Sequence, residues 1–445
     1  ASEDALDVGA LQWLPWRTGG ETMHFPCFGP EQGPRLEASL EHWMEKMQGS
    51  AYACVVKLRC SKGLLCKSLT APWLAASDSQ DQSLFEIPRL PPDASFAFML
   101  EPETETADDD ELYSRREAIK KHLYLQVAVL YTNSRGERLL RVHTQAVNVV
   151  TSVRMVFQSV SVFPLVALLM KQAAVLALGG KLGSAKPVAA KDFLQSFTLK
   201  VLATYHRHCS YSQENKKHLV ISKRLSLLPL FVLSMRKLIY LLTSGTVMDE
   251  IQAEECLRRL LRMPIHGILA ALYPRVYALP ANLNDGELPL ERPPMQEQLT
   301  CGNSPAYLVA NAFGAWFWQP ERGVHAGASG EGDEAAGEAH SAEELRANAE
   351  ALCHRLSESW APCISRLPLG NLPRLPAGGK RREPTTPTRS PRQGAPKVSF
   401  GMDEVTSWSD KVLLSSLFVE DEGVTEVAYG EWLNFLQEQV LRVSE

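Results

Sequence analysis

The sequence predicts a multidomain α+β protein that contains an antiparallel β-sandwich, an all-α unit and a closing α/β unit. Three observations predict this class. Strand-like runs rich in Val, Leu, Tyr and Phe occupy residues 51–150, apolar residues recur at helical spacing in 151–282, and both patterns occur after 283. The length of 445 residues agrees with about three domains, because a single core rarely grows beyond roughly 250 residues.

Charge and cysteine usage exclude some function classes. Lys and Arg number 46 against 51 Asp and Glu, a net charge of −5, whereas a nucleic-acid binder usually carries a basic excess. The nine cysteines form no CxxC pair and no four-ligand set, so we expect reduced thiols and no structural zinc site. The acidic residues that follow Ala1 predict that no signal peptide is present.

Residues 1–48 have the pattern of the end of a domain rather than of a complete one. A turn at Gly19-Gly20 interrupts an aromatic and apolar stretch. An amphipathic helix is expected after it, ending near Gly49, because apolar residues recur at helical spacing. These residues are Leu36, Leu40, Trp43 and Met47. No earlier strand is expected to pack against this helix.

Residues 49–150 predict the antiparallel β-sandwich. Strand-like runs lie at 51–61, 95–100, 123–133 and 138–150. The string "NSRGE" between the last two predicts a hairpin, with Gly136 able to adopt a positive φ. Residues 101–111 carry seven acids and are expected to form a solvated loop.

The first of these runs contains an unusual pair of cations. Side chains alternate between the two faces of a strand, so Lys57 and Arg59 point to one side and the apolar residues between them to the other. The two cations then lie about 6–7 Å apart along the strand. Either they are ordinary solvated residues, or they bind an anionic ligand.

Residues 151–282 predict the all-α unit. One apolar stripe comprises Phe193, Phe197, Val201 and Tyr205. The apolar runs at 161–170 and 225–234 have about half of the roughly 20 residues that a membrane span requires, so both are expected to be buried helices, the second beginning near Ser226. Between 200 and 262 there are eleven Lys or Arg against five Asp or Glu, which indicates a solvated surface or a patch for anionic lipid or an acidic partner.

Residues 283–445 mix both patterns. Two short strands are predicted around Asn311, and a closing helix is predicted at 429–443. An acidic, low-complexity insert at about 322–344 and a basic, Pro-rich insert at about 373–397 are predicted to be disordered, because neither can bury enough apolar area. Thr386 and Ser390 precede prolines in the second insert, either as kinase targets or within an unmodified linker.

Catalytic motifs give no support for an enzyme. The string "LGGKLGS" at 178–184 lacks the four-residue gap of a phosphate-binding loop, and neither GxSxG nor HExxH occurs. We therefore expect a protein that acts by binding.

Several strings, in order along the chain, resemble the cargo-adaptor subunit of the COPII inner coat, the secretory protein twenty-four family. "LRCSKGL" and "VAVLYTNSRGERLLRVHT" resemble its β-sandwich, "LSLLPLFVLSMRK" and "ALYPRVYAL" its helical domain, and "RTGGETMHFPCF" the end of its trunk domain. "LFVEDEGVTEVAYGEWLNFL" is similar to its closing signature. The matches are collinear over about 420 residues, from about 17 to 436.

The resemblance implies a division of the chain and a binding site. Residues 1–48 correspond to the end of an α/β trunk, 49–150 to the sandwich, 151–282 to the helical domain and 283–445 to a gelsolin-like domain. In the family, a basic pocket binds acidic ER-export signals, with two cations of an Arg-x-Arg pair in the strand before "CSKGL". Those positions are Lys57 and Arg59 here, and Val129 is expected to line the apolar side of the pocket.

The family's mode of action implies partners and a location. We expect a coat subunit that binds ER-export signals for ER-to-Golgi transport, together with a twenty-three-type subunit, the cytosolic tails of membrane cargo and SNAREs, and the anionic ER membrane surface. It would be cytoplasmic and peripheral on the ER membrane and COPII vesicles, at ER exit sites. The family's zinc finger has no counterpart here, so no cofactor is expected in this chain.

Two alternatives remain open from the sequence. The twenty-three-type subunit shares the architecture and activates the coat GTPase by inserting an arginine, for which no candidate can be singled out. A gelsolin-like calcium- or actin-binding module would need clustered carboxylates at calcium-ligand spacing, and the acids at 331–344 lack that spacing.

Overall fold

The computed structural model describes most of the sandwich and helical regions and shorter pieces elsewhere. The described residues are 11, 14–15, 17–22, 29–30, 33–62, 64–70, 83–92, 94–102, 122–150, 152–178, 187–209, 218–243, 250–279, 291–292, 306–313, 315–318, 347–349, 351–352, 403–404, 418, 421 and 427–444. Most of the acidic loop expected at 101–111 and both expected inserts, at 322–344 and 373–397, lie outside the described residues.

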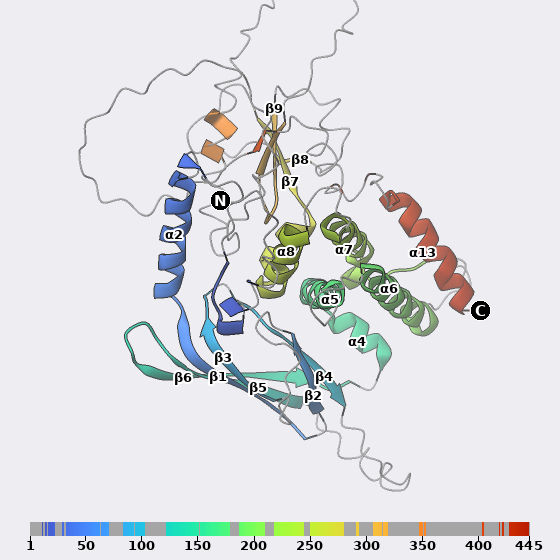
Figure 1. Cartoon of the computed structure of the whole chain (residues 1–445). Coiled ribbons are helices and arrows are strands. Elements are labelled where there is room, and N and C mark those ends of the chain that lie inside the picture. Colours follow the sequence, from blue (N-terminus) through green and yellow to red (C-terminus); the bar gives the residue numbers. More distant parts are fainter. Residues whose placement is uncertain are drawn as a thin grey trace, which may run out of the picture.

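The predicted antiparallel β-sandwich is confirmed (Figure 1). Its strands are β1 Ala51–Cys60, β2 Leu64–Thr70, β3 Leu84–Leu90, β4 Ala97–Pro102, β5 His122–Thr132 and β6 Arg138–Asn148. The larger sheet has the order β3-β1-β5-β6, and β2 pairs with β4. Between the sheets lies a core of Cys54, Val56, Phe85 and Ile87, against which Phe98 of β4 packs.

Two of these strands, β2 and β3, were not predicted from the sequence. β3 contains Pro88, which has no N–H to donate to a neighbouring strand. The strand tolerates it because β3 is the edge strand of its sheet. The hairpin between β5 and β6 was predicted, and there Gly136 has φ +83° and the Asn133 side chain accepts from the backbone N–H groups of Arg135 and Glu137.

The helical unit follows the sandwich. It comprises α4 Val153–Ser159, α5 Val162–Ala177, α6 Pro187–Cys209, the 3₁₀ helix η2 Lys223–Leu225, α7 Leu228–Thr243, α8 Glu250–Arg262 and α9 Ile265–Leu272. Both apolar runs are buried helices, as expected: Val166 and Met170 of α5 and Leu228 and Val232 of α7 lie in the core. By length and composition alone, residues Lys223–Thr243 could cross a membrane, but 72% of that apolar window is buried within the fold.

A five-stranded sheet follows, with the order β11-β10-β9-β7-β8. Its strands are β7 Arg275–Leu279, β8 Glu291–Arg292, β9 Ala306–Ala310, β10 Ala315–Trp318 and β11 Asp403–Glu404. The two strands predicted around Asn311 are β9 and β10. The expected boundary between 282 and 283 needs correction, because β7 already belongs to this sheet and pairs with β9 over its whole length.

The closing helix also packs with a different unit from the one expected. α13 Tyr429–Ser444 packs on α6 and α7 (Figure 1), so it completes the helical unit although the domain assignment placed it with the sheet. Trp432 is buried, donates from Nε1 to the carbonyl oxygen of Pro229 at 3.1 Å, and lies under the Arg236 guanidinium at 4.9 Å. Lys237 of α7 donates to the carbonyl oxygens of Phe418 and Asp421, which ties these two residues to α7.

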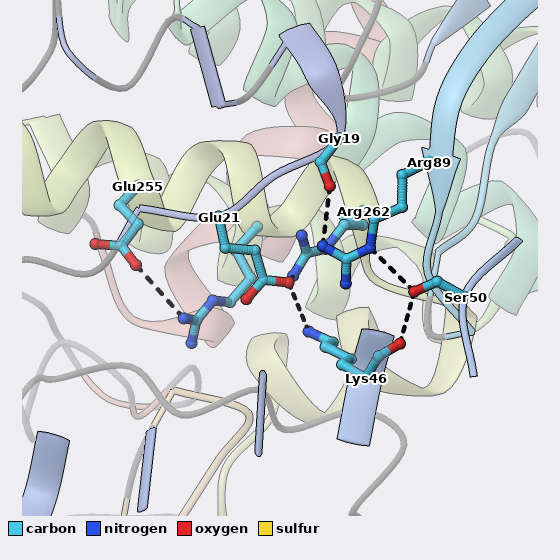
Figure 2. A network of polar contacts seen from close by, with 8 residues as sticks. Gly19, Glu21, Lys46, Ser50, Arg89, Glu255 and Arg262 are labelled. Atoms are coloured by element: carbon cyan, nitrogen blue, oxygen red, sulfur yellow. Dashed lines mark hydrogen bonds and ion pairs between the residues drawn. The ribbon is translucent and has the colours of Figure 1, made fainter. Parts of the chain in front are cut away.

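The predicted N-terminal helix is α2, Gly33–Gln48, and a polar network joins it to the other units (Figure 2). Glu21 accepts from Lys46 of α2 at 3.0 Å and from Arg262 of α8 at 2.9 Å. Burial opposes ionisation of this carboxyl, but the two cations outweigh burial and lower the pKa of Glu21 to about 2. The network therefore contains an ionised carboxylate that links three segments.

Arg89 of β3 extends this network. Its Nε donates to Ser50 Oγ at 3.0 Å and its Nη1 to the carbonyl oxygen of Gly19 at 3.1 Å (Figure 2). The guanidinium also lies 6.0 Å from the Trp43 ring. Gly19 has φ +76°, and a Cβ there would lie 2.8 Å from the Arg89 backbone oxygen. The predicted turn at Gly19-Gly20 is thus a close approach between two segments, which a side chain at 19 would prevent.

Candidate functional site

The larger sheet of the sandwich has one face on the core and one face turned away from it, here called the outer face. Strand β1 assigns its residues to the two faces by simple alternation. Cys54, Val56 and Leu58 are buried on the core face. Lys57, which is half-buried, and Arg59, which is exposed, lie on the outer face as predicted.

Cross-strand pairing defines what surrounds the two cations. Residues paired directly across an antiparallel ladder lie on the same face. Lys57 pairs with Leu84 of β3 on one side and with Ala128 of β5 on the other. Arg59 pairs with Gln126, whose Nε2 donates to Thr144 Oγ1 of β6 at 3.2 Å. The cations therefore have an apolar neighbourhood at one end and a polar one at the other.

The structure does not bring Val129 together with Lys57 and Arg59. Val129 pairs with Val56, a core-face residue, and packs against the sandwich core. Its neighbour Ala128 occupies the position beside Lys57. The difference is one residue of register, which reverses the face of every side chain on a strand.

The outer face has an apolar part that sequence reasoning missed. Pairing places Leu130 and Leu140 in line with Val55, and Val142 in line with Ala128 and Lys57. Leu140 is 65% exposed and Val142 is 47% exposed, so both offer uncovered apolar area. The signal was present as alternating apolar residues in 138–142, but it becomes a surface only when the register between β5 and β6 is known.

The charge of the outer face favours an anionic ligand. The four strands β1, β3, β5 and β6 contain one acidic residue, Glu86, which pairs with Val55 and lies on the outer face. Lys57 and Arg59 thus outnumber the acidic residues that these strands place on the outer face. A guanidinium and an ammonium beside exposed Leu and Val side chains can bind a carboxylate together with a neighbouring apolar group.

In the part of the chain that the structure describes, no group of three or more His, Cys, Asp or Glu side chains lies close enough together to hold a metal ion. The Cys54 thiol is buried, and burial raises its pKa to about 11, which makes it a poor ligand or nucleophile.

Family models match two regions of the chain. A Sec23/Sec24 beta-sandwich domain matches residues 51–150, and a Sec23/Sec24 helical domain matches residues 164–269. The first region contains all strands of the sandwich, and the second extends from α5 into α9.

Curated relatives and a solved structure agree with these matches. Protein transport protein SEC24 A of Arabidopsis thaliana is 27% identical over 279 residues, which cover 62% of this chain and 25% of that protein. Protein transport protein Sec24B of Homo sapiens is 26% identical over 306 residues, 66% of this chain and 22% of that protein. The crystal structure of the human COPII-coat protein Sec24c matches 99% of this chain and 51% of that one, with a TM-score of 0.69 and 17% identity.

The likeness to Sec24c shows the fold, and the chain spans about a quarter of the length of the curated relatives it matches. Two collinear domain matches, relatives from plants and animals that are all named Sec24, and this fold agree with one another. The chain therefore contains beta-sandwich and helical domains of the Sec23/Sec24 type, and it is similar to Sec24 proteins over about two thirds of its length.

Proposed function

We propose that this chain acts as part of a COPII coat subunit that binds ER-export signals on membrane cargo during ER-to-Golgi transport. Its relatives are named protein transport proteins, and Sec24c is titled a COPII-coat protein. It acts by binding alone, without catalysis and without a cofactor in this chain. Its partners are a twenty-three-type coat subunit, the cytosolic tails of cargo and SNAREs, and the anionic ER membrane surface, and it does not bind nucleic acid.

This mode of action sets the location. The protein works from the cytoplasm as a peripheral component of the ER membrane and of COPII vesicles, at ER exit sites. Individual signals bind weakly to such a site, and many copies arranged in one coat make the capture effective.

The observation that carries this proposal is the outer face of the sandwich. Lys57 and Arg59 lie side by side on it, and the exposed apolar side chains of Val142 and Leu140 continue the same surface. An acidic peptide that also carries an apolar residue satisfies both parts. The cations supply charge-assisted hydrogen bonds to carboxylates, and the apolar part removes a Leu or Met side chain from water.

A peptide titration tests the proposal. A fluorescent peptide with an acidic export signal is titrated against the wild-type chain and against Lys57→Ala/Arg59→Ala. We expect the double substitution to weaken binding by about tenfold or more, because each charge-assisted hydrogen bond contributes roughly 1.5–3 kcal/mol. Wild-type binding should also weaken at high salt, since the contacts are exposed.

A matched variant separates the site from overall charge. Arg141→Ala/Lys200→Ala also removes one arginine and one lysine, both exposed, from the other face of the sheet and from α6. It should bind the peptide like the wild type. Equal losses in the two variants, or no loss in either, would show that Lys57 and Arg59 do not form the cargo site.

A further inference from the structure

The helical unit exposes apolar side chains on α4, at the start of α5 and on the segment that leads into α7. These residues, here called the α4 patch, are Val153, Met155, Val156, Phe163 and Leu227, each at least 40% exposed. Figure 1 shows α4 at the periphery of the helical unit, below α6 in this view. Surface apolar residues are ordinary when scattered, but a group on one short helix and its neighbour requires an explanation.

The packing of α4 fixes which way the patch faces. Phe157 is the buried anchor of α4, and its ring meets that of Tyr205 of α6 edge to face at 5.1 Å. Met155 lies two positions earlier, about 200° around the helix from Phe157, and therefore points away from the core. The buried Phe157 thus orients α4 so that Met155 and the adjacent Val156 face solvent, at 50% and 46% exposure.

Neighbouring elements extend the patch. α4 contacts η2, which leads through Leu227 into α7. Leu227 accepts a backbone hydrogen bond from Phe231 one turn later, and the Phe231 ring meets that of Phe163 edge to face at 6.4 Å. The exposed groups from α4, α5 and the start of α7 therefore belong to one region.

The rim of the patch is basic. Arg154 of α4 and Lys223 and Arg224 of η2, which α4 contacts, are all exposed. No Asp or Glu occurs in 151–191 or in 215–248, the stretches that supply α4, α5, η2 and α7. A partner that covers the patch must accordingly be anionic around an apolar centre.

We propose that the α4 patch is a membrane contact, in which Met155 and Val156 enter the interfacial layer of an anionic bilayer while the surrounding cations bind lipid head groups. Apolar side chains on a short helix with a basic rim are the usual composition of such a contact. The proposal deepens and rests on the proposed function, because a peripheral coat subunit works against a membrane. It adds apolar insertion at a defined site to the electrostatic attraction already proposed.

Vesicle binding tests the proposal. The chain is sedimented with vesicles of phosphatidylcholine alone and of phosphatidylcholine mixed with phosphatidylserine, at low and at high salt. Met155→Ser/Val156→Ser should weaken binding to the anionic vesicles about tenfold at both salt concentrations, since apolar burial is not screened. Lys223→Ala/Arg224→Ala should weaken it about tenfold at low salt and little at high salt.

Matched controls show whether the position matters. Met44→Ser/Val188→Ser changes the same two residue types at comparably exposed positions on α2 and α6, and should leave vesicle binding unchanged. Arg141→Ala/Lys200→Ala removes two exposed cations outside the patch and should have a smaller effect than Lys223→Ala/Arg224→Ala. Circular dichroism and thermal unfolding confirm that each variant is folded.

Three outcomes overturn the inference. The first is failure of the wild type to bind anionic vesicles, and the second is an equal effect of the patch and control variants. The third is a variant Met155→Ser/Val156→Ser that still binds vesicles but has a different oligomeric state from the wild type in sedimentation velocity. The last would make the patch a contact between copies of this chain. The peptide titration on the same variants separates this inference from the proposed function. If a variant loses vesicle binding but still binds the peptide, its cargo site is intact.

Discussion

Glu21 is the residue on which the junction of the N-terminal segment depends. Its carboxylate lies between Lys46 and Arg262, and its side chain is 18% exposed. We predict that Glu21→Gln lowers the free energy of unfolding by about 3 kcal/mol at neutral pH, because two largely buried cations lose their counter-charge. Urea denaturation measures the change, and Glu41→Gln on the exposed side of α2 is the control.

The same carboxylate predicts a pH dependence. The pKa of Glu21 is about 2 in the folded protein and about 4.5 when it is unfolded, so its contribution is complete above about pH 5 and is lost as pH falls towards 2. The wild type should therefore lose stability more steeply than Glu21→Gln over this range. Parallel pH curves for the two proteins would show that the ion pairs with Lys46 and Arg262 do not contribute to folding.

At the scale of single residues, the sequence predicts which face of its own strand a side chain lies on, but not which residue of the neighbouring strand it pairs with. The positions of Lys57 and Arg59 on one face of β1 follow from alternation within one strand. Val129 is on β5, and its face relative to Lys57 depends on the register between β1 and β5. Register is set by contacts across the sheet, so sequence alone places a residue on the partner strand only to within one position.

At the scale of elements, α13 offers a test of an unexpected packing. Trp432→Ala should lower the free energy of unfolding by about 4 kcal/mol, because it empties a buried site and removes the hydrogen bond to Pro229. The exposed Asn434→Ala on the same helix should change it by less than about 0.5 kcal/mol.

A double-mutant cycle with Arg236 identifies the neighbour of Trp432. The guanidinium of Arg236 lies over the indole ring, so Arg236→Ala and Trp432→Ala should show a coupling of about 0.5–1 kcal/mol. Strict additivity would mean that the Arg236 guanidinium does not interact with the Trp432 ring.

Elements with strong local signals were predicted, and those that depend on tertiary context were not. The apolar run in α7 and the "NSRGE" hairpin are local signals. β3 carries Pro88, which argues against a strand until the strand is known to be at an edge. In α6 the predicted stripe through Phe193 is only half-buried, while the adjacent Leu194 and Leu202 face the core, because the packing of the neighbouring helices decides which side of α6 is covered.

At the scale of the whole molecule, the order of units followed from the sequence but their boundaries did not. β7 follows α9 after only Tyr273 and Pro274, a connection too short to mark the change from helix to sheet as a domain boundary. Tyr307 and Trp316 of the sheet share a core with the helices, and so does Trp432 of α13. Boundaries drawn from linear pattern therefore divide units that pack as one.

Lys171 joins the sandwich to the helical unit and predicts how the assembled molecule responds to pH. It donates to the carbonyl oxygen of Leu261 at the end of α8 and to that of Ser95. The backbone N–H of Ser95 in turn donates to the carbonyl oxygen of Arg262 at 3.0 Å. Burial lowers the pKa of Lys171 to about 7 from an ordinary 10.5. Between these values the unfolded chain binds more protons than the folded one, so the free energy of unfolding should rise with pH.

Other groups also titrate in this range, so the prediction concerns a difference between proteins. Urea denaturation between about pH 7 and pH 9 should show a smaller rise for Lys171→Met than for the wild type, and the exposed Lys200→Met should follow the wild type. If all three proteins gave parallel curves, Lys171 would be protonated throughout, held in its charged form by the carbonyl groups of Ser95 and Leu261. Because those carbonyls come from both units, the result also shows whether the junction between them contains a charge or a neutral amine.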